Sequence, residues 1–420
     1  MEPHIQTRRD RAAKAWDAKD TIVLIGAGDR ILIPGTGDQM YPFRSHPDYF
    51  YLTDHECPGA VLAFDAAEGW TDFVPDVTEK ERVWEAGTQA EGTSITLLGA
   101  WLAGRRGRVI AMLGVELPGQ RFDAARSLEL RERLLHARRP KDAAELERIR
   151  VAAKATAAGY AAVRDAIRPG AVERAIATEL DAGFRRGGAD GIAYESIVGT
   201  GPNSAVLHFD PTDRAAKEGE LVLIDAAAEF RRYACDVTRT FPAGKSFTPE
   251  QRDLYALVLA VETKAVERCV PGAEMADVHE ASFLETTKGL VEMGFLRGTP
   301  EGLVEQGVTE LFYPHGIAHM VGLGVRDATG KLAGRLPRTD AGKRLQRMDL
   351  PLEPGYVLTI EPGIYFIPPL LQDPKRREKF ADAVVWSKVD PWMAQGGIRI
   401  EDTVHVTAGA PENMTAAIPK

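Results

Sequence analysis

The stretch LVLIDAAAEFRRYACDVTRTF, residues 221–241, decides the fold that we expect for this chain. It contains two β-rich segments, LVLIDAAA and YACDVTRTF, on either side of EFRR, and this arrangement predicts an antiparallel hairpin. A tight turn centred between Phe230 and Arg231 would place Asp225 directly opposite Asp236, with β-carbons roughly 4.5–5.5 Å apart. EFRR lacks the Asn-Gly or Asp-Gly pair typical of a two-residue hairpin loop, so this register is an inference from the spacing.

Two opposed aspartates inside β-forming sequence need a physical explanation. Strand interiors disfavour Asp. Two carboxylates this close also repel each other, so one of them stays protonated unless a cation lies between them. Either Asp225 or Asp236 alone could form a salt bridge or cap a turn, but the opposed pair favours a metal site.

The composition is that of a globular protein long enough for two or three domains. The chain has 420 residues, of which 44% are hydrophobic and 27% are charged. A net charge of −9 argues against a nucleic-acid-binding protein, which usually carries a basic patch. We also expect no membrane span and no secretory signal, because no apolar segment of either kind is visible. Three widely spaced cysteines without a CxxC pair predict reduced thiols, and therefore a cytoplasmic protein.

A proline-containing charged segment, HARRPKD around Pro140, predicts the boundary between two domains, because it interrupts helical spacing on both sides. Strands that alternate with short helical stretches predict an α/β domain at 1–139. These strands are expected at 21–28, 30–35, 47–54, 59–65, 71–76 and 108–114. For residues 140–420 we expect helices at 142–167, 171–187, 248–270 and 276–293, and strands near 194–199, 356–366 and 396–406.

Two more carboxylates lie in predicted strands, Glu361 in LTIEPGIYF and Glu401 in GGIRIEDTVHV. An unpaired charge buried there would cost several kcal/mol. Two divalent cations balance the charge of four carboxylates, so the set predicts a dinuclear centre. Clean alternation along 396–406 also places Arg399 on the same strand face as Glu401.

A histidine from the segment HGIAH could complete this centre. His315 and His319 are four residues apart, but the surrounding glycines argue against a helical HExxH zinc site. An oxygen-rich shell with one imidazole, from His319, favours Mn²⁺ or a similar hard ion over a structural zinc. Two such ions activate water and polarise a carbonyl, so hydrolysis is the expected reaction. His208, in AVLHFDP, stands alone in the sequence and could be an ordinary partly buried histidine.

These segments together resemble the proline-specific metallopeptidases, aminopeptidase P and Xaa-Pro dipeptidase. The resemblance is carried by LVLIDAAAEFRRYACDVTRTF, HGIAHMVGLGVRD, LTIEPGIYF, GIRIEDTVHVT and, near the N-terminus, YPFRSHPDYFYLTDHECPGAVLAFD. It spans nearly the whole chain. It implies an aminopeptidase-P-like α/β domain at 1–139. It also implies an α+β catalytic domain of the pita-bread fold at 140–420, with a curved and mostly antiparallel sheet, and a homodimer.

The resemblance also implies a role for each residue of the site. The two metal ions would be Mn²⁺, with Co²⁺ or Zn²⁺ as alternatives. Asp225 would chelate one ion, Asp236 and Glu401 would bridge both, and His319 and Glu361 would complete the second. Glu361 would also handle protons for the attacking water and the leaving nitrogen.

Two residues outside the ligand set complete this assignment. His208 would contact the substrate and the developing oxyanion, so the predicted catalytic residues are His208, His319 and Glu361. Arg399, which we group with the substrate-binding residues, would hold Glu401 in its orientation.

The chain departs from the family pattern at Arg326. The family usually has His-Asp after the HGxxH segment, and this chain has Arg326-Asp327. An arginine is always charged and cannot replace a neutral histidine in proton transfer. It could instead bind a substrate carboxylate, or point away from the site and leave the activity reduced.

The substrate class depends on Arg347, which lies seven residues before Pro354. It resembles the arginine with which prolidases hold the C-terminal carboxylate of a dipeptide, although a solvated arginine is the simpler interpretation. We therefore predict a Xaa-Pro dipeptidase whose partner is a proline-containing peptide. The alternative is aminopeptidase P, which acts on longer peptides and which Asp38, Arg44 and Trp84 resemble. A non-peptidase hydrolase on the same fold stays open, whereas the intact ligand set argues against a non-catalytic binding protein.

Overall fold

The computed structural model describes residues 2–85, 90–332, 334–336 and 346–420. The chain divides into two compact units, Met1–Arg138 and Arg139–Lys420. Among the described helices, none has the length and apolar character needed to cross a membrane.

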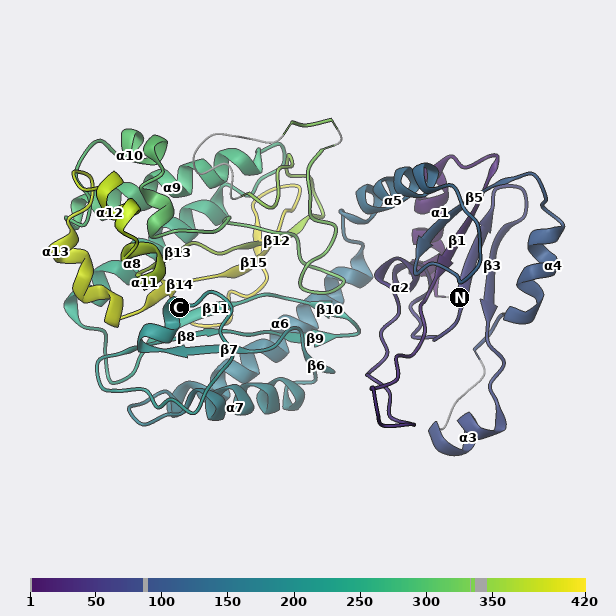
Figure 1. Cartoon of the computed structure of the whole chain (residues 1–420), viewed down its shortest axis with the longest axis horizontal. Helices are drawn as coiled ribbons and strands as arrows, with labels where there is room; N and C mark the ends of the chain where they lie inside the picture. Colours follow the sequence, from purple (N-terminus) through teal and green to yellow (C-terminus); the bar gives the residue numbers. More distant parts are fainter. Residues whose placement is uncertain (1, 86–89, 333, 337–345) are drawn as a thin grey trace. The chain divides into compact units, whose positions relative to one another are not determined.

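The first unit is built on a five-stranded sheet with the order β4-β3-β2-β1-β5 (Figure 1). Strand β1 lies between β2 and β5, and it runs antiparallel to β2 and parallel to β5. The strands are β1 (Thr21–Gly26), β2 (Val61–Asp65), β3 (Gly69–Val74), β4 (Thr93–Ser94) and β5 (Val109–Gly114). The helices are α1 (Pro3–Trp16), α2 (Pro47–Thr53), α3 (Glu79–Glu85), η1 (Ile95–Leu97), α4 (Leu98–Ala103) and α5 (Ala124–Arg138).

Two strands predicted for this unit are wrong. Residues 47–54 form the helix α2, because Pro47 occupies its first turn and the His46 ring accepts a hydrogen bond from the Asp48 N–H. Residues 48–53 are buried, so packing on all sides outweighs the β propensity of the aromatic run. The segment 30–35 contributes only an isolated bridge between Leu32 and Met40.

The described residues of the second unit form four short antiparallel sheets. Their orders are β11-β8-β7, β10-β9-β6, β12-β15-β16 and β13-β14. Isolated bridges such as Thr238–Glu401 and Met320–Leu358 continue the pairing between them. The strands are β6 (Gly191–Ile192), β7 (Ile197–Thr200), β8 (Leu221–Asp225), β9 (Ala228–Phe230), β10 (Tyr233–Ala234), β11 (Thr238–Pro242), β12 (Val357–Ile360), β13 (Gly363–Tyr365), β14 (Gly397–Arg399), β15 (Asp402–His405) and β16 (Glu412–Asn413).

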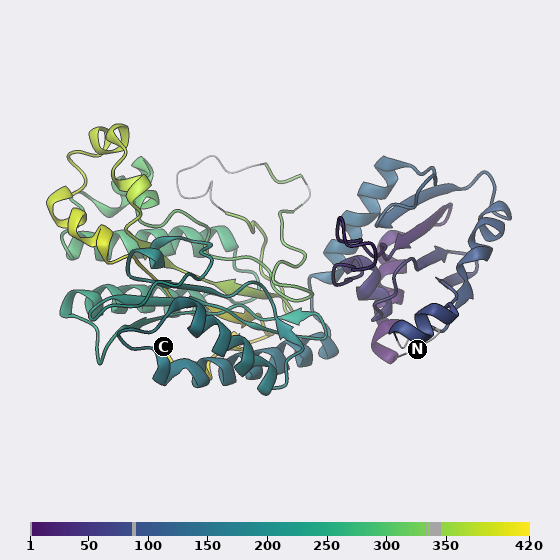
Figure 2. The ribbon, with the colours of Figure 1, turned by 60° about the horizontal axis from the view of Figure 1, so that its bottom comes forward.

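Helices cover this curved set of strands on two sides (Figures 1 and 2). The pair α6 and α7 packs against β7, β9 and β10, whereas α8, which packs on α9, contacts β12, β13 and β14. The longer helices are α6 (Ala143–Val163), α7 (Glu173–Arg186), α8 (Pro249–Glu267), α9 (Met275–Glu292) and α10 (Pro300–Gln306). The shorter ones are α11 (Pro368–Leu371), α12 (Pro374–Lys379), α13 (Trp386–Val389), η2 (Arg164–Ala166), η3 (Gly201–Ala205), η4 (Thr309–Leu311) and η6 (Asp390–Ala394).

Local sequence signals explain where the main helices begin. Asp142 forms a capping box with Glu145 at the start of α6, and Thr248 forms another with Gln251 at the start of α8. The helix predicted at 248–270 therefore begins at its Thr248 cap and runs from Pro249 to Glu267. An α/β unit followed by an α+β unit with antiparallel strands confirms the predicted fold class.

Candidate metal centre

The hairpin of residues 221–241 has a different register from the predicted one. Phe230 pairs with Tyr233, and Asp225 pairs with Thr238, so Asp236 lies opposite Ala227 rather than opposite Asp225. The turn residues are Arg231 and Arg232, with φ angles of 47° and 69°. Positive φ at both central positions is the pattern of a type I′ turn, which normally selects Asn or Gly. Arg231-Arg232 carries no such signal, and the predicted turn centre is therefore wrong by one residue.

The two aspartates nevertheless converge, because a shift of two positions keeps them on one face of the hairpin. The hydroxyl of Tyr194 lies 2.7 Å from Asp225 Oδ1 and 2.5 Å from Asp236 Oδ1. Sequence reasoning missed Tyr194. A tyrosine 31 residues before Asp225 and 42 before Asp236 carries no local sign of this contact.

The four carboxylates lie where strands end or break. Asp225 ends β8, Asp236 lies between β10 and β11, Glu361 lies between β12 and β13, and Glu401 lies between β14 and β15. The predicted continuous strand 396–406 is therefore interrupted at Ile400 and Glu401. A side chain at such a break is released from the strict alternation of a sheet, so four separate segments can direct oxygen atoms to one place.

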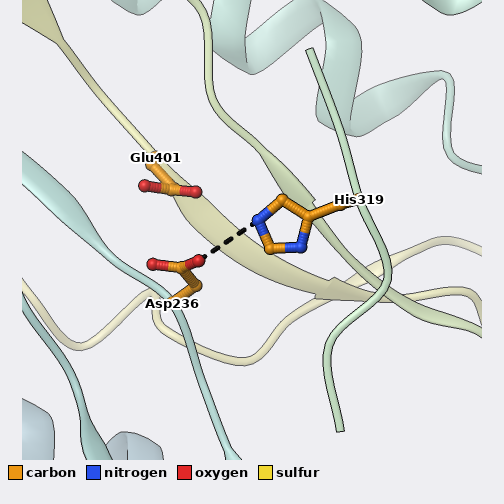
Figure 3. Close-up of side chains that lie close together, drawn as sticks. All are labelled: Asp236, His319 and Glu401. Carbon is orange, nitrogen blue, oxygen red and sulfur yellow. Dashed lines mark ion pairs between the residues drawn. The ribbon is translucent and has the colours of Figure 1, made fainter. Parts of the chain in front are cut away.

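Donor atoms of Asp236, His319 and Glu401 all lie within 4.8 Å of one another (Figure 3). His319 Nε2 is 3.3 Å from Asp236 Oδ2 and 3.7 Å from Glu361 Oε1. His319 Nδ1 lies 3.1 Å from the carbonyl oxygen of Met320, which can only accept, so Nδ1 carries the proton. The lone pair of Nε2 therefore faces the carboxylate oxygens.

The electrostatics of this cluster favour a bound cation. Burial raises the pKa of Asp225, Glu361 and Glu401 above the usual carboxyl range, and the charge of Asp236 raises each of them further. A set of acceptors that face one another and repel is stabilised by cations between them. Four carboxylates and one neutral imidazole fit two divalent ions of the hard type.

Hydrogen bonds from the surrounding protein support the carboxylates. Arg399 donates from Nη2 to Asp225 Oδ2 at 2.6 Å and from Nε to the hydroxyl of Thr238 at 2.9 Å. Thr238 in turn donates to Glu401 Oε2 at 2.6 Å. The third nitrogen, Nη1, donates to the hydroxyl of Tyr365. Arg399 is 3% exposed, and these contacts fit an orienting role rather than direct contact with a substrate.

His315 is a second site residue that the sequence analysis did not assign. Its Nε2 lies 2.9 Å from the hydroxyl of Tyr365, and its Nδ1 lies 3.7 Å from Glu361 Oε2. Burial lowers the pKa of His315 to about 3, and the positive charge of Arg399 contributes further. The ring is therefore neutral. Its Nδ1 lies 2.9 Å from the carbonyl oxygen of Gly316 and carries the proton, so Nε2 accepts the hydrogen bond from Tyr365.

The predicted substrate-binding residues other than Arg399 lie outside this buried cluster. His208 follows η3, and its side chain is exposed, as are those of Arg326 and Arg347. Both arginines are close enough to act on the site electrostatically. Burial raises the pKa of Glu361, and the charge of Arg326 lowers it. Burial lowers the pKa of His315, and the charge of Arg347 lowers it further. Of the segment around Arg347, residues 343–345 lie outside the described residues.

Comparison with known proteins explains this arrangement. Residues 147–408 match the model of metallopeptidase family M24, and residues 5–95 match that of the aminopeptidase P N-terminal domain. The chain belongs to metallopeptidase family M24. The pita-bread fold predicted for its catalytic unit is thereby confirmed, as is the prediction of a metallopeptidase.

Several similar proteins match almost all of this chain. A "Probable Xaa-Pro aminopeptidase pepP" of Talaromyces marneffei is 33% identical over 414 residues, which cover 90% of this chain and 86% of the relative. One of the same name from Aspergillus niger is 30% identical, with 99% and 94% covered. Among solved structures, the aminopeptidase PepP of Pseudomonas aeruginosa has a TM-score of 0.79 and 28% identity, with 99% and 96% covered. Aminopeptidase P of Escherichia coli with the inhibitor Pro-Leu has a TM-score of 0.80 and 26% identity, with 100% and 97% covered.

These relatives favour the alternative that the sequence analysis left open. The similar proteins are named Xaa-Pro aminopeptidases, and residues 5–95 of this chain match the aminopeptidase P N-terminal domain. The expected dipeptidase preference rested on Arg347, and it is less well supported than the aminopeptidase alternative.

Proposed function

We propose that this M24 protein is a Xaa-Pro aminopeptidase, which removes the residue preceding proline from the N-terminus of peptides. The observation that carries the proposal is the buried cluster of Asp236, His319 and Glu401 in a chain similar over its length to proteins named Xaa-Pro aminopeptidases. The convergence of Asp225 and Glu361 on the same cluster adds support.

The residues proposed to hold two divalent ions are Asp225, Asp236, His319, Glu361 and Glu401. When bound, the ions would supply Lewis-acid activation of water and of the scissile carbonyl. Manganese is the ion we propose, because oxygen atoms dominate the donor set, with Co²⁺ and Zn²⁺ as alternatives.

The other tasks fall to the side chains of the chain itself. Glu361 is the one proposed ligand that is partly exposed, so it is suited to exchange a proton between water and the leaving nitrogen. His208 is proposed to contact the substrate and to donate to the oxyanion. Arg399 and Thr238 are proposed to hold Asp225 and Glu401 in position, so that little reorganisation accompanies the reaction.

Arg326 and Arg347 give this chain a positive substrate end. Both are exposed, and both influence the electrostatics of the buried cluster. Guanidinium groups bind carboxylates bidentately, so we propose that these arginines favour short peptides whose C-terminal carboxylate reaches them. This proposal keeps a role for Arg347 without making the protein a strict dipeptidase.

The test compares Ala-Pro, Ala-Pro-Ala and a longer Ala-Pro peptide as substrates of the Mn²⁺-loaded protein. We expect cleavage before proline in the tripeptide and the longer peptide. Arg347→Ala should lower kcat/KM about tenfold for the shortest cleaved peptide and less for the longest, because a distant carboxylate loses less. Arg252→Ala, at an exposed arginine of α8, is the matched control. Intact tripeptide and longer peptide would refute the aminopeptidase, and equal losses on all peptides would refute the role of Arg347.

A cytoplasmic location and a homodimer belong to the same proposal. Cys57, Cys235 and Cys269 are free thiols, which supports a reducing compartment. The homodimer rests on the family resemblance alone.

A further inference from the structure

Glu173, at the start of α7, is a buried carboxylate with an unusually complete set of partners. Its side chain is inaccessible to solvent. Oε1 accepts hydrogen bonds at 2.8 Å from the N–H and the hydroxyl of Thr200 and from the side-chain amide of Asn203. Oε2 accepts from the N–H of Thr212 at 3.1 Å and from its hydroxyl at 2.6 Å.

These partners lie at the two ends of one segment, residues 200–212, which contains η3 and His208. Thr200 ends β7, and Thr212 begins the stretch that pairs with the start of α7 through the Arg174 N–H and the Thr212 carbonyl. A single carboxylate therefore closes the segment into a loop. The glycine at position 201, with a φ of 52°, allows the tight turn after Thr200.

Residues inside the loop contact β14 and the apolar cluster that contains Tyr365, beside the candidate metal centre. Ser204 Oγ accepts a hydrogen bond from the N–H of Gly397, at the start of β14. Leu207 packs against the apolar cluster of Ala205, Leu223 and Tyr365. The hydroxyl of Tyr365 bonds to both His315 and Arg399. The residue after Leu207 is His208, so the same short segment that reaches the site presents the histidine.

The charge state of Glu173 is consistent with a carboxylate that holds the two ends of the loop together. Burial raises the pKa of Glu173, but hydrogen bonds from Thr212, Asn203 and Thr200 outweigh burial and lower it below the usual value. The carboxylate is therefore ionised at neutral pH, and all five donors are satisfied. Charge-assisted hydrogen bonds of this kind are roughly twice as strong as neutral ones.

We propose that Glu173 is a positioning residue that holds the 200–212 loop closed, and thereby fixes His208 at the substrate end of the site. This inference rests on the proposed function, because it assigns His208 to substrate binding. Glu173 itself touches neither substrate nor metal. An ordinary surface carboxylate at a helix N-terminus would not need partners from two distant parts of the chain.

The decisive experiment is a double-mutant cycle between Glu173→Gln and His208→Ala, with an Ala-Pro-Ala-type peptide and Mn²⁺-loaded protein. Glutamine keeps the size of the side chain, but its NH₂ group cannot accept both bonds from Thr212. We expect Glu173→Gln to lower kcat/KM by about ten- to a hundredfold, as is typical when a group that orients a site residue is lost. In the His208→Ala background the same change should have little further effect.

Two controls separate positioning from general stability. Glu179→Gln changes an exposed glutamate of the same helix and should leave kcat/KM unchanged. Thr212→Val removes only one donor to Glu173, so it serves if Glu173→Gln does not fold, and it should show a smaller loss with the same dependence on His208. Equal losses with and without His208, or no loss, would overturn the proposal.

A second readout does not depend on peptide cleavage. Hydrogen–deuterium exchange of residues 201–211 should become faster in Glu173→Gln than in the wild type or in Glu179→Gln, because the loop opens at one end. Unchanged exchange would also overturn the proposal. A wild-type protein that leaves Xaa-Pro peptides intact would instead refute the proposed function, and the exchange experiment would still test whether Glu173 holds the loop.

Discussion

The two ends of the candidate site differ in how closely the protein surrounds them. At the ligand end, Asp225, Asp236, His319 and Glu401 are buried, and neighbouring side chains donate to the carboxylates. At the substrate end, His208, Arg326 and Arg347 are exposed.

This difference separates two physical requirements. Buried charges that converge on one point must be oriented in advance, because repulsion would otherwise spread them apart. Groups that select a substrate must stay accessible to it. Changes at the ligand end should therefore reduce the cleavage of every peptide alike, whereas changes at the substrate end should alter the preference among peptides.

The largest effect is expected for Asp236→Ala, which removes a proposed bridging ligand from the centre of the cluster. Metal content should fall, and kcat should drop by at least about a thousandfold on every peptide, because the remaining carboxylates lose a shared cation. Metal analysis by mass spectrometry and steady-state kinetics measure the two losses. Asp253→Ala, at an exposed position of α8, is the control and should change neither. Full metal content together with full activity would remove the basis for the ligand end as we describe it.

A smaller loss is expected for Thr238→Val, which preserves shape but removes the hydroxyl between Arg399 and Glu401. The substitution leaves a buried donor and a buried acceptor without their partner. We expect kcat/KM to fall about ten- to a hundredfold, by the same factor for short and long peptides.

Thr178→Val is the control for this change, because the hydroxyl of Thr178 donates to a carbonyl oxygen of its own helix. A loss that depended on peptide length would show that Thr238 acts at the substrate end, and the comparison between the two ends would then fail.

The same contrast explains what the sequence could predict. Carboxylates in β-forming segments are visible as local anomalies, which is why Asp225, Asp236, Glu361 and Glu401 could be proposed from residue type and spacing. The supporting contacts are not local. Tyr194 and Glu173 act across 27 to 42 residues of chain, and nothing in their own segments indicates the partner.

The errors in the fold also have causes that lie outside the local sequence. The register of the hairpin depended on a turn formed by Arg231 and Arg232 at positive φ, which neighbouring contacts such as that of the Arg231 N–H with Asp190 stabilise. Residues 47–53 were expected to form a strand because their aromatic side chains favour one, and burial on all sides made a helix the stable form. The preferred length of the substrate could not be predicted from the sequence for a related reason. It depends on exposed side chains whose partner is the peptide itself.

The smallest effect on activity is expected for a change at Glu262 of α8, which lies outside the proposed ligand set. Its buried side chain binds the Lys420 ammonium group at 2.6 Å, and Lys420 also binds Asp402, the neighbour of Glu401. Burial raises the pKa of Glu262 to about 7, and the charge of Asp402 contributes further. The folded protein therefore keeps a proton that the unfolded chain releases near its ordinary pKa of about 4.3.

Because the folded-state pKa is raised, this stabilising contribution is complete below pH 4.3 and is lost as the pH rises toward 7. The side chain of Glu262→Gln is neutral at every pH. Its free energy of unfolding should therefore increase relative to that of the wild type as the pH rises from about 4.3 to about 7, by up to about 3 kcal/mol. Urea unfolding at pH 5 and pH 8 measures the difference. Glu267→Gln, exposed on the same helix, should follow the wild type at both pH values. If Glu262→Gln also followed the wild type at both pH values, Glu262 would be ionised in the folded state. Its contact with Lys420 would then stabilise the segment next to Glu401 at neutral pH.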